Sequence, residues 1–126
     1  MAKKIHFSKN APAAVGPYSQ AVEVDGFVFC SGQISINPKN QEVFKGEVTE
    51  QTKMVMENVK NVLAAADLTL ENVIKTTIFI TDMNDFAKIN EVYGGYFKKD
   101  PPARSTVQVS ALPKGVNVEI EVIAKR

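Results

Sequence analysis

The sequence contains one cysteine, one histidine and no long apolar segment. With Cys30 as its only cysteine, the chain can form no intrachain disulfide and no zinc site built from cysteines. His6 lies near an N-terminus that we expect to be mobile, so neither a Ser–His–Asp triad nor a histidine acid/base pair is available. No stretch approaches the roughly 20 apolar residues of a membrane span, and the N-terminus lacks an apolar run of secretory-signal length. These absences favour a cytoplasmic protein with no membrane partner.

An excess of charge of one sign is also lacking. Lys and Arg number 15 and Asp and Glu number 14, so the net charge is +1. Proteins that bind nucleic acid through phosphate neutralisation usually carry a clear basic excess, so we expect no specific nucleic-acid partner. The sequence shows no Walker loop, dinucleotide fingerprint or metal-ligand cluster. Its 44% hydrophobic and 23% charged residues exclude wholesale disorder and fit a single globular domain of 126 residues.

The first half of the chain predicts a hairpin followed by a helix. Two apolar runs within residues 19–31 flank Asp25-Gly26, which favours a tight type I′ turn because that turn needs positive φ at both central residues. A polar segment, 37–46, follows. Thr49 is the expected N-cap of a helix. The apolar stripe of this helix consists of Val55, Val59, Val62, Leu63 and Ala66.

A strand and a second helix come next. Residues 73–80 are rich in β-branched side chains, which favour strands. Asp82 is the expected cap of the second helix, and Pro101-Pro102 prevent that helix from continuing. The apolar face of this helix consists of Phe86, Ile89, Tyr93 and Phe97.

The last two strands complete an α+β domain. Residues 104–110 and 117–124 alternate between apolar and polar side chains, and we expect them to pair as a hairpin across the loop 111–116. The resulting order is β-β-α-β-α-β-β, with two helices on one face of a mixed sheet, since a strand–helix–strand crossover implies some parallel pairing.

The strand at 73–80 indicates that the chain associates with itself. Two helices can cover only one face of the sheet, yet this strand is apolar on both. Ile74, Ile78 and Ile80 occupy one face, and Val73 and Phe79 the other. Self-association is the simplest way to bury an apolar face that no helix covers, so we expect a homo-oligomer.

The last strand places two carboxylates on the uncovered face. Glu119 and Glu121 lie opposite the apolar side chains of Val118, Ile120, Val122 and Ala124. A carboxylate buried in an interface needs a partner or a function, because its desolvation is costly. The alternative is that both glutamates lie on a solvated edge and do nothing, as most strand carboxylates do.

Arg104 follows two prolines, which stiffen the chain that presents it. A guanidinium is a natural receptor for a substrate carboxylate, because it can donate two parallel hydrogen bonds. The alternative is an ordinary surface arginine. The hairpin register puts Arg104 nearer Ile123 than Glu119, which leaves about four residues, or ~13 Å of strand, between Arg104 and Glu119. We therefore expect these two side chains to flank a ligand on one sheet face rather than to pair.

Two further segments could line a site. Tyr18 lies just before the first strand, and Ser31-Gly32 ends the second, where a glycine lets a ligand or water approach the main chain. Each segment is also ordinary turn chemistry. Cys30, inside an apolar strand, is expected to be a buried and inert thiol.

These segments together resemble the RidA (YjgF) family. The likeness runs from near the N-terminus to the last residue and is carried by APAAVGPYSQAV (11–22), CSGQI (30–34), IKTTIFITDMNDFAKINEVYGGYF (74–97), PPARSTVQVSALPKG (101–115) and VEIEVIAKR (118–126). It implies a single chorismate-mutase-like domain, 1–126, in a homotrimer with three clefts between subunits. It also implies hydrolysis of reactive 2-enamino or 2-imino acids, such as 2-aminoacrylate and 2-iminobutanoate, to 2-oxo acids and ammonia, with no cofactor or metal.

The resemblance further implies a role for individual residues. Arg104 would bind the substrate carboxylate, and Glu119 would orient or activate water. The cleft would be lined by Tyr18, Ser31, Gly32 and Thr106, with Phe86 and Asn90 as peripheral members.

Thr106 departs from the family pattern, since many members have a cysteine two residues after the arginine. We expect this position to act through its backbone amide, so deaminase activity survives but thiol redox switching there is absent. Two alternative functions remain. One is a non-catalytic trimer that binds small carboxylates and regulates another protein. The other is a ribonuclease or translation inhibitor, against which the net charge and the lone histidine argue.

Overall fold

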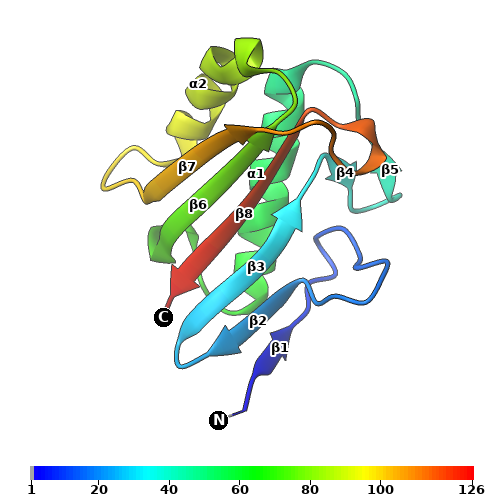
Figure 1. Ribbon diagram of the computed structural model, residues 1–126. Helices are drawn as coiled ribbons and strands as arrows, with labels where there is room; N and C mark the ends of the chain where they lie inside the picture. The colour runs from blue at the N-terminus through cyan, green and yellow to red at the C-terminus, as the bar shows by residue number, and fades with distance from the viewer. Residues whose placement is uncertain (1) are drawn as a thin grey trace.

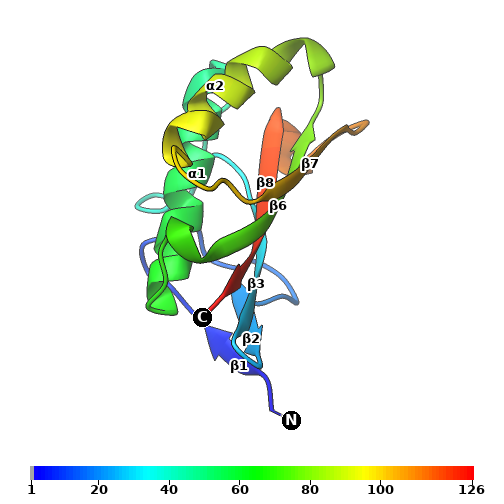
Figure 2. The same cartoon turned by 90° about the vertical axis from the view of Figure 1, so that its left-hand side faces the viewer.

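The computed structural model describes residues 2–126 and consists of one main sheet with two helices packed against one face (Figures 1 and 2). The main sheet has the strand order β1-β2-β3-β8-β6-β7, and β4 and β5 form a small separate sheet. The predicted α+β fold, with two helices on one face of a mixed sheet, is confirmed. The elements are β1 (Lys4–His6), β2 (Ala21–Val24), β3 (Phe27–Gln33), β4 (Ile36–Asn37), β5 (Glu42–Val43), α1 (Val48–Ala65), η1 (Leu70–Asn72), β6 (Val73–Ile80), η2 (Met83–Asp85), α2 (Phe86–Tyr96), β7 (Ala103–Gln108), η3 (Pro113–Gly115) and β8 (Val118–Lys125).

The predicted turn between β2 and β3 is confirmed. Asp25 and Gly26 have φ values of 53° and 80°, the left-handed conformation that a type I′ turn requires. Strand β1 was not predicted, and most of the small β4–β5 sheet lies in the polar segment 37–46, for which no strand was predicted.

The helix starts differ from the predicted caps. Helix α1 begins at Val48 after Glu47, so Thr49 lies inside the helix and is not its N-cap. The helix therefore begins two residues earlier than a Thr49 cap would allow, and the Val48 side chain of its first turn is buried against the core. Asp82 accepts a hydrogen bond from the Asn84 amide and so caps the 3₁₀ turn η2, which leads into α2 at Phe86.

The predicted hairpin between the last two strands is wrong. Strand β8 is antiparallel to both β3 and β6 and lies between them, whereas β7 pairs parallel with β6 at the edge of the sheet. The side-chain pattern explains this exchange. The inward residues of β8, centred on Ile120, are fully buried beneath α1, whereas most side chains of β7 are exposed.

The face of the sheet away from the helices is uncovered in the single chain, as Figure 2 shows. It presents exposed aromatic and aliphatic side chains, including Phe27, Phe29 and Val107. Ile78 and Ile80 share one face, as predicted, and this is the face that the helices cover, but the assignment of Val73 and Ile74 is reversed. The register of β6 shifts between Val73 and Lys75, which buries Val73 and leaves Ile74 exposed.

Candidate functional site

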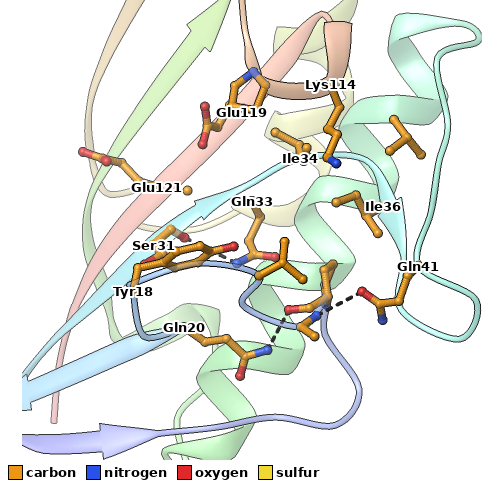
Figure 3. A pocket seen from close by; sticks show the side chains of 16 residues that line it. Tyr18, Gln20, Ser31, Gln33, Ile34, Ile36, Gln41, Lys114, Glu119 and Glu121 are labelled. Atoms are coloured by element: carbon orange, nitrogen blue, oxygen red, sulfur yellow. Dashed lines mark hydrogen bonds between the residues drawn. The ribbon is translucent and has the colours of Figure 1, made fainter.

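A cavity of about 750 Å³ lies where β3 ends and β8 begins. Four of the predicted site residues line it: Tyr18, Ser31, Gly32 and Glu119 (Figure 3). Lys114 and Gln41, which the sequence did not single out, also line the cavity. Both have a positive φ, Gln41 between β4 and β5 and Lys114 within η3, and no pattern in the sequence marks such residues as cavity-lining.

Glu119 and Glu121 are the two acidic residues that line this cavity, and Glu119 is the more buried of them. The Glu119 carboxylate is half-buried on the sheet face away from the helices and makes no hydrogen bond or ion pair with residues 2–126. Burial raises the pKa of Glu119 above its ordinary value, and the negative charge of Glu121 raises it further. An unpaired carboxylate of this kind is suited to accept and return a proton.

Gly32 provides the space that the Glu119 side chain occupies. A Cβ atom at position 32 would lie only 2.8 Å from Cδ of Glu119 and closer still to its Oε2. The absence of a side chain therefore lets the carboxylate lie against the main chain of β3.

Ser31 and Tyr18 complete this half of the site. The Ser31 hydroxyl donates a hydrogen bond of 2.6 Å to the Ser19 carbonyl, which leaves its oxygen lone pairs as acceptors. The Tyr18 side chain is half-exposed, and its hydroxyl makes no hydrogen bond with residues 2–126. Both hydroxyls lie at the cavity wall.

Arg104 belongs to a second cluster, on β7 and α2. Its Nη1 donates a 2.6 Å hydrogen bond to Oδ1 of Asn90. Its Cζ lies 5.5 Å from the ring centroid of Phe86 and 5.2 Å from that of Tyr93. Phe86 and Asn90 thus lie beside Arg104. Tyr93 was predicted only as part of the apolar face of α2. Its position seven residues after Phe86 places it on that face but does not distinguish a core residue from one that contacts Arg104.

Arg104 and Glu119 lie on opposite faces of the sheet, not on one face as predicted. Arg104 pairs in register with Thr76, which faces the helices. Glu119 pairs with Phe79, which faces away from them. Strand β6 also separates the two strands that carry them. The predicted distance along a hairpin therefore does not apply, and one chain cannot bring both side chains to one ligand.

Residues 8–126 match the model of the protein family described as Endoribonuclease L-PSP. The chain belongs to this family, the YjgF/RidA family. It is 52% identical over 122 residues to a RutC family protein of Pyrococcus horikoshii, with 97% of each chain covered. It is 46% identical to the mouse protein named 2-iminobutanoate/2-iminopropanoate deaminase, over 97% of this chain and 90% of that one. The solved structure of Escherichia coli TdcF with bound serine has a TM-score of 0.93 and 48% identity, covering 98% of each chain.

Thr106, on the same strand as Arg104, is the residue at which this RidA family member departs from the expected family pattern. It lies two residues after Arg104 on the same face of β7. Its Oγ1 is buried and has no hydrogen-bond partner among residues 2–126. An unsatisfied buried hydroxyl costs about 1–3 kcal/mol, and no hydrogen bond within residues 2–126 offsets this cost at Thr106.

Cys30 and His6, for which no catalytic role was predicted, lie outside both the Glu119 cavity and the Arg104 cluster. Cys30 is buried, as predicted, and burial raises the pKa of its thiol to about 12, which disfavours the reactive thiolate. His6 is not in a mobile end but is buried in β1, 2.7 Å from Glu23. Within residues 2–126, no group of three or more His, Cys, Asp or Glu side chains could hold a metal ion. No helix in this part of the chain is long and apolar enough to cross a membrane.

Proposed function

We propose that this RidA family member hydrolyses reactive 2-enamino and 2-imino acids to 2-oxo acids and ammonia. The observation that carries the proposal is the half-buried, unpaired Glu119 carboxylate in a cavity it shares with Tyr18 and Ser31. The 46% identity to the mouse protein named a deaminase of 2-iminobutanoate and 2-iminopropanoate supports the choice of substrate. The scheme needs no cofactor or metal, and the cytoplasm is the proposed location.

The substrate needs little activation by the protein, because an imine carbon is already electrophilic. Glu119 accepts a proton from water as the oxygen adds to the C=N carbon and passes it to the nitrogen, which gives a carbinolamine. Glu119 then takes the proton of the new hydroxyl and returns it to the amino nitrogen as the C–N bond breaks, so that the C=O bond forms and ammonia leaves. A raised pKa suits a group that must take up and release a proton in one cycle. Tyr18 and Ser31 hold the water and the leaving nitrogen, and Gly32 keeps the approach open.

Arg104 holds the substrate carboxylate in this scheme, with the Thr106 hydroxyl beside it and Phe86 and Asn90 behind it. Because Arg104 and Glu119 lie on opposite faces of one sheet, we infer that each site combines Arg104 of one subunit with Glu119 of another. A homotrimer with three clefts between subunits meets this need. It also buries the exposed apolar face around Phe29 and Val107.

The test measures formation of 2-oxobutanoate while a threonine dehydratase supplies 2-iminobutanoate. We expect Glu119→Gln to slow the catalysed reaction by about 10²- to 10⁴-fold, the usual contribution of an acid/base group. Arg104→Ala should abolish acceleration over the spontaneous reaction. The matched control is Glu121→Gln on the same face of β8, which should retain most of the activity. Full activity in the Arg104→Ala protein would overturn the site assignment.

Two other functions have distinct outcomes in the same set of variants. A non-catalytic regulator that binds small carboxylates would need Arg104 but would be unaffected by Glu119→Gln. The description of the matching family, Endoribonuclease L-PSP, suggests a ribonuclease. Net charge and the engagement of His6 with Glu23 argue against it, and ribonuclease activity that disappears on further purification would exclude it.

A further inference from the structure

The side chain of Arg104 has a fixed position although it lies on an exposed edge strand. Residues 86, 90 and 93 are four and seven positions apart on α2, so their side chains share one helix face. That face supplies two aromatic rings and an amide oxygen to a single guanidinium. Arg104 forms no ion pair within residues 2–126, and the bond to Asn90 uses one of its five N–H donors.

Tyr93 is the most firmly held member of this cluster. Its side chain is only 4% exposed, and the ring of Phe97 packs against it at 4.9 Å between centroids. The Tyr93 hydroxyl forms a buried 2.7 Å hydrogen bond with Oγ1 of Thr76. Phe86, by contrast, is partly buried, and Asn90 is exposed.

The hydrogen bond between Tyr93 and Thr76 connects α2 to β6, the strand that pairs with the strand of Arg104. Thr76 is fully buried in β6 and is the residue that pairs in register with Arg104 of β7. The backbone of Arg104 thus pairs with Thr76, and its side chain contacts Tyr93, which is hydrogen-bonded to the same threonine. Burial raises the pKa of Tyr93, so the ring remains neutral and presents its π-face to the cation.

We propose that Tyr93, anchored by Thr76, is a positioning residue that holds the Arg104 guanidinium ready for the substrate carboxylate. This inference rests on the proposed function, in which Arg104 is the carboxylate ligand. Without the support, a long arginine side chain on an edge strand would lose rotamer freedom each time it bound substrate. Tyr93 therefore affects substrate binding rather than the chemical step, which takes place at Glu119.

The experiment compares kcat and KM for 2-iminobutanoate, together with the inhibition constant of the product 2-oxobutanoate. Tyr93→Leu removes the ring and the hydroxyl. It should raise KM and the inhibition constant by about tenfold each and leave kcat within about twofold. The control is Tyr96→Leu on the same helix, whose hydroxyl bonds Glu57 rather than any residue near Arg104. That variant should have the wild-type KM.

Two milder variants test the anchor without emptying the core. Tyr93→Phe and Thr76→Val each remove one end of the hydroxyl bond, and each should raise KM about threefold. The double variant should be no worse than either single one, because both remove the same interaction.

The results separate this inference from the function it rests on. A Tyr93→Leu protein with reduced kcat but unchanged KM would have only a structural defect and would overturn the positioning role. If Tyr93→Leu does not fold, a wild-type KM in both milder variants would overturn it equally. If Arg104→Ala itself leaves KM and the inhibition constant unchanged, the carboxylate assignment to Arg104 fails, whatever the Tyr93 variants do.

Discussion

Arg104 and Glu119 project from opposite faces of the same sheet, on two strands that β6 separates. Neither side chain makes an ion pair within residues 2–126. Two charged groups that serve one small substrate must converge to within a few ångströms of it. If both groups act on one substrate, as we propose, a second copy of the chain must supply one of them, and assembly is then part of the proposed site.

Mixing two inactive variants tests this requirement. Arg104→Ala and Glu119→Gln subunits, unfolded together and refolded in equal amounts, should regain about a quarter of the wild-type activity. A cleft is intact only when the chain that supplies the arginine and the chain that supplies the glutamate are each unmutated at that position. The measurement is the coupled formation of 2-oxobutanoate. Refolding each variant alone is the control, and no recovery in the mixture would mean that both residues act within one chain or that one of them does not act at all.

Substitution of Gly32 should displace the catalytic carboxylate. In Gly32→Ala the new Cβ would lie 2.8 Å from Cδ of Glu119, so the glutamate side chain must move. We expect a loss of activity of at least about tenfold with little change in the free energy of unfolding, because the displaced atoms are the end of a flexible, half-buried side chain. Gly94→Ala is the matched control, because a Cβ there meets nothing within 4 Å and should stabilise α2 by about 0.5–1 kcal/mol. Wild-type activity in Gly32→Ala would show that the position of the carboxylate is not critical.

The pH dependence of catalysis should report on Glu119. Burial, and then the charge of Glu121, raise the pKa of Glu119, so its carboxylate becomes protonated at a higher pH than an ordinary glutamate. A base must be ionised to act, so kcat/KM should fall as the pH drops through this raised pKa. Glu121→Gln removes the second cause and should move that fall to lower pH. An acid limb that does not move in Glu121→Gln would show that another group titrates there.

His6, near the N-terminus, and Arg126, at the C-terminus, both contact Glu23, which predicts a stability that depends on pH. Hydrogen bonds from Arg126, at 2.9 and 3.0 Å, and the contact with His6 lower the pKa of Glu23 from 4.5 to about 2. A lowered pKa means that the carboxylate stabilises the fold above pH 4.5 and loses this effect as the pH falls toward 2. Glu23→Gln should therefore unfold at a lower temperature than wild type at pH 7, with a gap that closes over that acid range.

Glu91→Gln on the surface of α2 is the control for this stability series, because Glu91 forms no ion pair within residues 2–126. It makes the same change of charge and should unfold at nearly the wild-type temperature. The Glu23 effect itself should be modest, since solvent screens a partly exposed pair. A gap that stays constant from pH 7 to pH 2 would contradict the role assigned to Glu23.

The local features of this protein could be predicted from its sequence. The positive φ values at Asp25 and Gly26 follow from the need of a type I′ turn for residues that tolerate them. Alternation along 118–124 correctly placed Glu119 and Glu121 on the face away from the helices. These features depend on side-chain periodicity and turn chemistry, which act over a few residues. The grouping of Tyr18, Ser31 and Gly32 with Glu119 came from the family resemblance, because no local rule joins segments so far apart in the chain.

The order of the strands was decided only by the tertiary structure. The alternation of β7 and β8 fits a hairpin as well as the observed arrangement, because it does not identify the neighbours of a strand. Burial of Ile120 and its neighbours under α1 draws β8 into the centre of the sheet and leaves β7 parallel to β6 at the edge. That exchange turns Arg104 toward α2 and away from Glu119. The sequence by itself thus determined the two helices, every strand of the main sheet except β1, and the faces of the carboxylates, whereas the competition for the core determined which charged groups one chain can bring together.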